Sequence, residues 1–208
     1  MELLLATNNQ FKQKEMLWHL EGLEGINLHY MSDLAEPIEV VEDGKTLLEN
    51  AEKKAREISE QTDWYVLTSD AGVDIPGLGE RWDMTRPKRI VGEHKDDLGK
   101  LKTLLEIMEG LSSTDRACKF HIALALGLKG QVVWSKEVEA EDGVIVETFD
   151  DRPISPNTWM ARAWYYPEVG KTDEDLTPDQ RSKMRQQHQS DMKQDLQLKI
   201  KALISSES

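Results

Sequence analysis

Cysteine is nearly absent from this 208-residue sequence, which contains Cys118 alone. No disulfide can therefore form within the chain, a composition that suits a reducing compartment. Long hydrophobic segments are also lacking, because no apolar run approaches the roughly 20 residues that a membrane-spanning helix needs. The first apolar run, Leu3 to Ala6, lacks the basic flank of a signal peptide. From these absences we expect a soluble, cytoplasmic protein with no membrane partner.

Positive charge is scarce as well. The 26 lysines and arginines face 39 aspartates and glutamates, which gives a formal net charge of −13. General nucleic-acid binding depends on neutralising phosphates with Lys and Arg, so we expect no nucleic-acid partner. A small anionic ligand remains compatible with the composition if a local basic pocket and a divalent cation offset its charge.

The opening residues combine a short apolar run, Leu3 to Ala6, with the polar residues 7–9 and a helix-like pattern that begins near Phe11. A strand that feeds a helix in this way directs free N–H groups toward one place, and Lys12 adds a full positive charge. Phosphate is therefore a candidate ligand, although the turn lacks the glycines of common phosphate motifs. The simpler alternative is a packed strand followed by a capped helix.

Thr46 and Glu49 form a capping-box pattern ahead of a helix that we expect to end near Glu60. The capping role makes a structural interpretation of Glu49 the stronger one, since a side chain folded back on the helix terminus needs no catalytic function.

Asp70 follows a second apolar run, Trp64 to Leu67, and we expect it in a loop of residues 68–72 after that strand. Ligands of α/β sheets collect where strands end, so Asp70 is a candidate metal ligand or carboxylate base. Its alternative role is a loop cap.

Two later segments carry charges or rings suited to a nucleotide. Residues 73–92 hold the densest basic patch of the first half, including Arg89. This segment is either a basic loop that contacts a polyphosphate or a solvated surface loop. Residues 150–170 are rich in aromatic side chains, among them Trp159, which either stacks on a base or fills a core. The final helix starts at Thr177 and Pro178, and Arg181 near its start could act on an anion together with the helix dipole.

The remaining pattern predicts strands, a helix and a tail. We expect short strands within residues 23–39, a helix over 98–111, a buried strand over 119–128, and a hairpin whose turn is residues 141–143. The buried strand and the two strands of the hairpin suggest three adjacent strands in a second lobe. We expect the tail, residues 205–208, to be disordered.

Four separated motifs resemble the inosine triphosphate pyrophosphatase family, whose members hydrolyse non-standard purine nucleoside triphosphates. The motifs are Ala6-Thr7-x-Asn9-x-x-Lys12-x-x-Glu15, Glu42-Asp-Gly-x-Thr46-x-x-Glu49-Asn50-Ala51-x-x-Lys54-Ala55, Ser69-Asp70-Ala-Gly72 and Gly143-Val-Ile. The resemblance implies an α/β fold and a single two-lobed domain over residues 1–208. A long central mixed sheet flanked by helices, a nucleotide cleft between the lobes and a homodimer belong to the same expectation.

The resemblance also implies roles for individual residues. Thr7, Asn9, Lys12 and Lys54 would hold the triphosphate, with Lys12 also acting in catalysis. Glu42 and Asp70 would hold Mg2+ and help to activate the attacking water.

Departures from the family pattern concern the base. The family's base-reading segment falls on residues 158–163, where an Asp position reads as Arg162, and its basic positions fall near Arg181 and residues 185–187. A guanidinium offers donors where a carboxylate offers acceptors. We therefore expect an altered base preference. Because Ser69 and Ala71 flank Asp70, the alternative is a catalytically impaired nucleotide-binding protein that retains the fold. A third option is a related enzyme for a non-purine or modified nucleotide.

Overall fold

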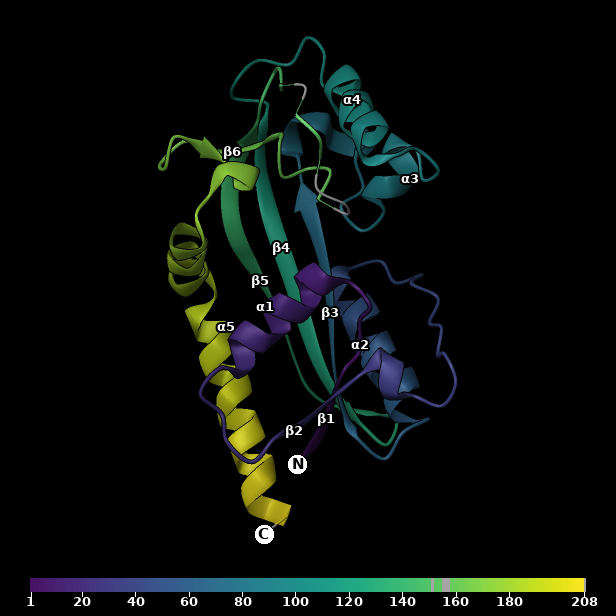
Figure 1. The fold of residues 1–208 in the computed structure, drawn as a ribbon. Coiled ribbons are helices and arrows are strands. Elements are labelled where there is room, and N and C mark those ends of the chain that lie inside the picture. The colour runs from purple at the N-terminus through teal and green to yellow at the C-terminus, as the bar shows by residue number, and fades with distance from the viewer. Residues whose placement is uncertain (151, 155–157, 208) are drawn as a thin grey trace. The chain divides into compact units, whose positions relative to one another are not determined.

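The computed structural model describes residues 1–150, 152–154 and 158–207. Its strands form one seven-stranded mixed sheet in the order β2-β1-β3-β4-β5-β6-β7 (Figure 1). The strands are β1 (Glu2–Leu5), β2 (Asn27–Tyr30), β3 (Tyr65–Asp74), β4 (Ala117–Leu128), β5 (Gln131–Ile145), β6 (Trp164–Tyr166) and β7 (Lys171–Thr172). Strand β1 is parallel to β2 and β3, whereas β6 is antiparallel to β5 and β7. The predicted α/β class with a mixed sheet is confirmed.

Helices and short 3-10 turns connect these strands. The α-helices are α1 (Gln10–Leu20), α2 (Leu47–Ser59), α3 (Pro87–Val91), α4 (Asp97–Ile107) and α5 (Pro178–Glu207). The 3-10 helices are η1 (Met31–Asp33), η2 (Pro76–Arg81) and η3 (Asp173–Asp175). Among the described residues, no helix combines the length and the hydrophobicity that crossing a bilayer requires.

Contacts divide the chain into two compact units. The first contains residues Met1–Ala71, Ile122–Val138 and Gln189–Ser208, and the second contains Gly72–His121 and Glu139–His188. In the first unit the apolar run of β1 is fully buried, as are Met192, Leu196 and Ile200 of α5. Helix α5 also packs against α1, because the Gln197 amide donates to the His19 carbonyl at 3.0 Å.

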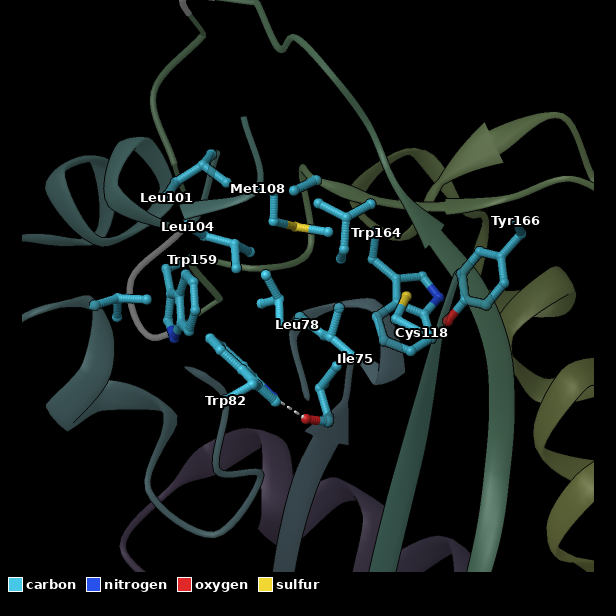
Figure 2. Packing of buried hydrophobic residues seen from close by; sticks show 14 of the residues in the cluster. Ile75, Leu78, Trp82, Leu101, Leu104, Met108, Cys118, Trp159, Trp164 and Tyr166 are labelled. Carbon is cyan, nitrogen blue, oxygen red and sulfur yellow. Dashed lines mark hydrogen bonds between the residues drawn. The ribbon is translucent and has the colours of Figure 1, made fainter. Parts of the chain in front are cut away.

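The second unit has its own core of large aromatic and aliphatic side chains (Figure 2). The Trp82 indole N–H donates to the Val73 carbonyl at 2.6 Å, which satisfies its polar atom inside the core. Trp159, Trp164 and Tyr166 belong to the same cluster. Their burial explains much of the aromatic content of residues 150–170, of which 151 and 155–157 lie outside the described part.

The predicted hairpin at residues 141–143 is wrong. Strand β5 runs without interruption through this segment, and the turn lies at Lys129 and Gly130, whose φ angles are 49° and 73°. Two successive positive φ angles are typical of a tight hairpin turn. Gly143 has a different role, because a Cβ there would lie 2.4 Å from the Trp164 ring. The glycine marks close packing against an aromatic side chain.

Two other expectations also differ from the structure. Asp70 lies within β3, which continues to Asp74 in place of the loop expected over residues 68–72. Residues 205–207, expected to be disordered, continue α5, where the Ser205 hydroxyl donates to the Lys201 carbonyl at 2.9 Å. Ser208 lies outside the described residues.

Candidate functional site

The turn between β1 and α1 is built by its own polar side chains. Asn9 is the N-cap of α1, and its side-chain oxygen accepts the Phe11 N–H at 2.9 Å. The Thr7 hydroxyl accepts the Asn9 N–H at 3.1 Å. These bonds fix the start of α1, so Lys12 in its first turn has a defined position.

The start of α2 is fixed in the same manner. The Thr46 hydroxyl accepts the Glu49 N–H at 3.1 Å, while the Glu49 carboxylate accepts the Lys45 N–H at 2.6 Å. The predicted Thr46 cap is confirmed, whereas Glu49 folds back on the N–H of Lys45, one residue before the cap, and so still has a structural role. Helix α2 then presents Asn50 and Lys54, one turn apart, on its buried face.

Asp70 is the centre of a polar cluster in the first unit. Its side chain is only 7% exposed. One carboxylate oxygen, Oδ1, lies 3.2 Å from Lys12 Nζ and 3.7 Å from Lys54 Nζ. The other oxygen, Oδ2, accepts from the Asn50 amide at 3.1 Å. A buried carboxylate is thus compensated by two ammonium groups and an amide, as its desolvation requires.

Lys54 joins Asp70 to Glu42. Its ammonium group donates to Glu42 Oε1 at 2.8 Å and to the Ser69 carbonyl at 2.7 Å. Glu42 and Asp70 therefore face the same positive charge, although Glu42 is half exposed and Asp70 is buried.

Electrostatics within this cluster favour an incoming anion. Burial, followed by the nearby Lys54 charge, lowers the pKa of Lys12 below that of a free lysine, against the opposing influence of Asp70 and Glu42. An added negative group would relieve the repulsion between the two ammonium groups. A phosphate oxygen is therefore a chemically suitable partner for the ammonium groups of Lys12 and Lys54.

The carboxylates of the cluster also suit Mg2+. No group of three or more His, Cys, Asp or Glu side chains within the described residues could hold a metal ion by itself. Mg2+ is commonly bound through one or two carboxylates together with substrate phosphates and waters. Glu42 and Asp70, which meet at one ammonium group, fit that form of binding.

The other predicted site residues belong to the second unit. Arg89 is exposed on α3, and Trp159 is buried in the core. Arg181 is half buried and ion-paired with Asp173, whose carbonyl accepts from Arg181 Nη2 at 2.6 Å. The structure thus joins Lys12, Glu42, Lys54 and Asp70 by contacts in the first unit, which also contains Thr7 and Asn9. The expected cleft between lobes stays a prediction.

Arg162, predicted to read the base, is buried and bonded to its own unit. Its guanidinium forms a two-pronged ion pair with Glu174, with distances of 2.7 and 3.0 Å. It also donates to the carbonyls of Asp150, Arg152 and Pro153. These contacts give Arg162 a structural function in holding the segment near residue 150.

Asn50 and Gly44 were not among the predicted functional residues. The Gly44 N–H donates to Asn50 Oδ1 at 2.8 Å, and the opposite end of the same amide contacts Asp70. A sequence signal existed: Asn50 and Lys54 are polar residues on the helix face that also contains Leu47 and Ala51.

Comparisons with known proteins identify relatives of the whole fold. The chain is 36% identical over 146 residues, 70% of its own length and 73% of the relative, to the dITP/XTP pyrophosphatase of Bacillus licheniformis. It is 29% identical over 189 residues to the same-named protein of Geobacillus kaustophilus, covering 88% and 87% of the two chains. The solved structure of a HAM1 protein from Coxiella burnetii superposes with a TM-score of 0.77 at 25% identity, covering 94% and 98%.

The family model described as Ham1 family matches residues 3–152, a range that includes the whole Lys12, Glu42, Lys54 and Asp70 cluster. The relatives' names agree with the family that the motifs indicate. This chain belongs to the Ham1 family.

Proposed function

We propose that this protein is a Mg2+-dependent nucleoside triphosphate pyrophosphohydrolase, which converts a ribo- or deoxyribonucleoside triphosphate to the monophosphate and pyrophosphate. The observation that carries the proposal is the cluster in which Asp70 contacts Lys12 and Lys54 while Lys54 also contacts Glu42. Support comes from the relatives of Bacillus licheniformis and Geobacillus kaustophilus, which are named dITP/XTP pyrophosphatases.

Lys12 and Lys54 bind the triphosphate and offset its negative charge. Both ammonium groups already lie against carboxylates, so they exchange these partners for phosphate oxygens when substrate binds. The turn of Thr7 and Asn9 contributes polar groups beside Lys12. Positioning and charge neutralisation supply most of what phosphoryl transfer asks of a protein.

Asp70 orients the attacking water and receives or relays its proton. The water oxygen bonds to the α-phosphorus, the bond from that phosphorus to the bridging oxygen breaks, and pyrophosphate leaves with the bridging oxygen. Asp70 and Glu42 are the residues that would hold Mg2+, which supplies charge stabilisation and a more acidic water when bound.

An altered base preference is part of the proposal. Arg162 stands where the family pattern has an acidic residue, and its N–H groups are directed to Glu174 and to backbone carbonyls. A guanidinium only donates hydrogen bonds, so Arg162 cannot provide a nucleotide base with the hydrogen-bond acceptors that an aspartate would. Arg89, Trp159 and Arg181 remain candidate substrate contacts, and a homodimer and a cytoplasmic location remain predictions.

A substrate panel tests the proposal. Purified protein with MgCl2 is given standard, deaminated and otherwise modified triphosphates, including dITP and XTP, and pyrophosphate and monophosphate are both quantified. We expect equimolar release of the two products from at least one triphosphate, and loss of release when EDTA replaces Mg2+. Triphosphate binding by calorimetry without turnover across the panel would instead support the nucleotide-binding alternative, which Ser69 and Ala71 beside Asp70 suggest.

A further inference from the structure

Asn50 is buried in the first unit, with 2% of its surface exposed, yet both ends of its amide are bonded. Its oxygen accepts the Gly44 N–H at 2.8 Å, and its nitrogen donates to Asp70 Oδ2 at 3.1 Å. Such a residue in a helix interior is costly to bury unless each polar atom has a partner.

The orientation of the amide follows from its two neighbours. A backbone N–H can only donate, so the atom that faces Gly44 must be the amide oxygen. An ionised carboxylate can only accept, so the atom that faces Asp70 must be the amide nitrogen. Both requirements select the same rotamer of Asn50, and a flipped amide would lose both hydrogen bonds.

Gly44 makes room for this arrangement. A Cβ at position 44 would lie 2.7 Å from Asn50 Oδ1 and 3.0 Å from the Glu49 Cβ. A side chain there would push the Asn50 amide away from its place. Gly44 also lies two residues after Glu42, so the hydrogen bond to Asn50 fixes the backbone that carries Glu42.

We propose that Asn50 is a positioning residue that orients Asp70 and the backbone beside Glu42, the two residues that would hold Mg2+. One end of its amide holds Asp70 Oδ2 and leaves Oδ1 facing the lysines. The other end holds the backbone beside Glu42. This inference rests on the proposed function and deepens it, since Asn50 acts through both candidate metal ligands without contacting substrate.

The test separates metal-linked binding from general damage. The affinity of the whole protein for inorganic pyrophosphate is measured by calorimetry with excess MgCl2 and again in EDTA, and the ratio of the two affinities is the Mg2+ gain. Asn50→Leu removes both hydrogen bonds at similar volume. We expect it to reduce the Mg2+ gain about 10- to 100-fold, the usual effect of losing an outer partner of a metal ligand. Pyrophosphate affinity in EDTA should change much less, because Lys12 and Lys54 remain.

Gly44→Ala provides an independent variant, since it displaces the Asn50 amide without substituting Asn50, Asp70 or Glu42. We expect it to lower the Mg2+ gain in the same direction, and to add little when combined with Asn50→Leu, because both changes act through one amide. If Asn50→Leu fails to fold, Gly44→Ala still tests the positioning role of Asn50. The matched control is Asn27→Leu, which removes an Asn amide that donates to Glu2 at 2.7 Å elsewhere in the same unit. It should retain the full gain.

The outcomes distinguish this inference from the proposed function. A wild-type protein that releases pyrophosphate, with variants that keep the full Mg2+ gain, overturns the positioning role and leaves the function standing. Equal loss of affinity with Mg2+ and in EDTA also overturns it, because a merely structural role would give that result. A wild-type protein without a Mg2+ gain and without turnover overturns both.

Discussion

Lys54 contacts three oxygen-bearing partners in the candidate site. It contacts Glu42, Asp70 and the Ser69 carbonyl while only 9% of its surface is exposed. Lys54→Met should raise the KM for the triphosphate roughly 10- to 100-fold, because a hydrogen bond to a charged group is worth about 1.5–3 kcal/mol. Steady-state kinetics measure the change.

Lys53 offers the matched control for that substitution. It is the adjacent lysine, and it pairs with Asp43 at 2.6 Å and with Glu57 at 3.8 Å. Lys53→Met removes the same charge from the same helix and should leave the KM nearly unchanged. Equal effects of the two variants would mean that net charge alone governs substrate binding, which contradicts the role of Lys54.

Cys118 should be slow to react in the folded protein. The residue is 1% exposed, and burial together with the charge of Asp142 raises the pKa of its thiol. A raised pKa means that the neutral thiol, which is unreactive toward disulfide reagents, predominates at pH 8. Labelling with a chromogenic disulfide should be slow without denaturant and should reach one thiol per chain in urea. Rapid labelling of the native protein would contradict the burial of β4 at this position.

Gly143 shows how strand β5 depends on a single small residue. The Trp164 ring packs so closely against Gly143 that a Cβ added at position 143 would lie 2.4 Å from the ring. Gly143→Ala should destabilise the protein by about 1–3 kcal/mol through overpacking, measured as the free energy of unfolding in urea. Asp142→Ala, a truncation at the exposed neighbouring residue, serves as the control and should cost less. A Gly143→Ala variant as stable as wild type would mean that β5 and Trp164 separate easily.

The elements with local signals could be predicted from the sequence, and those set by distant partners could not. Thr46 and Glu49 indicate the start of α2 because their capping hydrogen bonds involve neighbouring residues only. Judged from its sequence neighbours alone, Gly143 suggests a turn. In the structure a glycine is required there because the Trp164 ring, distant in sequence, packs against it. Asp70 was expected in a loop because small residues follow it, but β3 continues there within the sheet, between β1 and β4.

The site was predictable to a similar extent. Lys12, Lys54, Glu42 and Asp70 lie in motifs that resemble a known family, and the structure brings them into contact. The proposed positioning role of Asn50 depends on a hydrogen bond to a residue 20 positions further along the chain. No pattern of neighbouring residues specifies such a pair. The sequence therefore shows Asn50 as a motif residue on an apolar helix face, without its partner.

The charge of the whole molecule sets its behaviour toward nucleic acid. A formal net charge of −13 disfavours neutralisation of the phosphates of a duplex, on which general nucleic-acid binding depends. We expect no retardation of double-stranded DNA in a gel-shift assay at physiological salt. Salt-sensitive retardation would contradict this expectation and would indicate that the basic residues near Arg89 form a binding surface.

Two carboxylates of β3 allow a direct comparison of the candidate catalytic residue with a neighbour on the same strand. Asp70→Asn removes the charge at the centre of the cluster, whereas Asp74→Asn makes the same change at a half-buried residue of the same strand. Pyrophosphate release is measured for both variants with MgCl2 and the best triphosphate of the panel, after circular dichroism shows that both fold. We expect Asp70→Asn to lose nearly all activity and Asp74→Asn to retain it. Full activity of Asp70→Asn would contradict the proposal that the Asp70 cluster is the catalytic site.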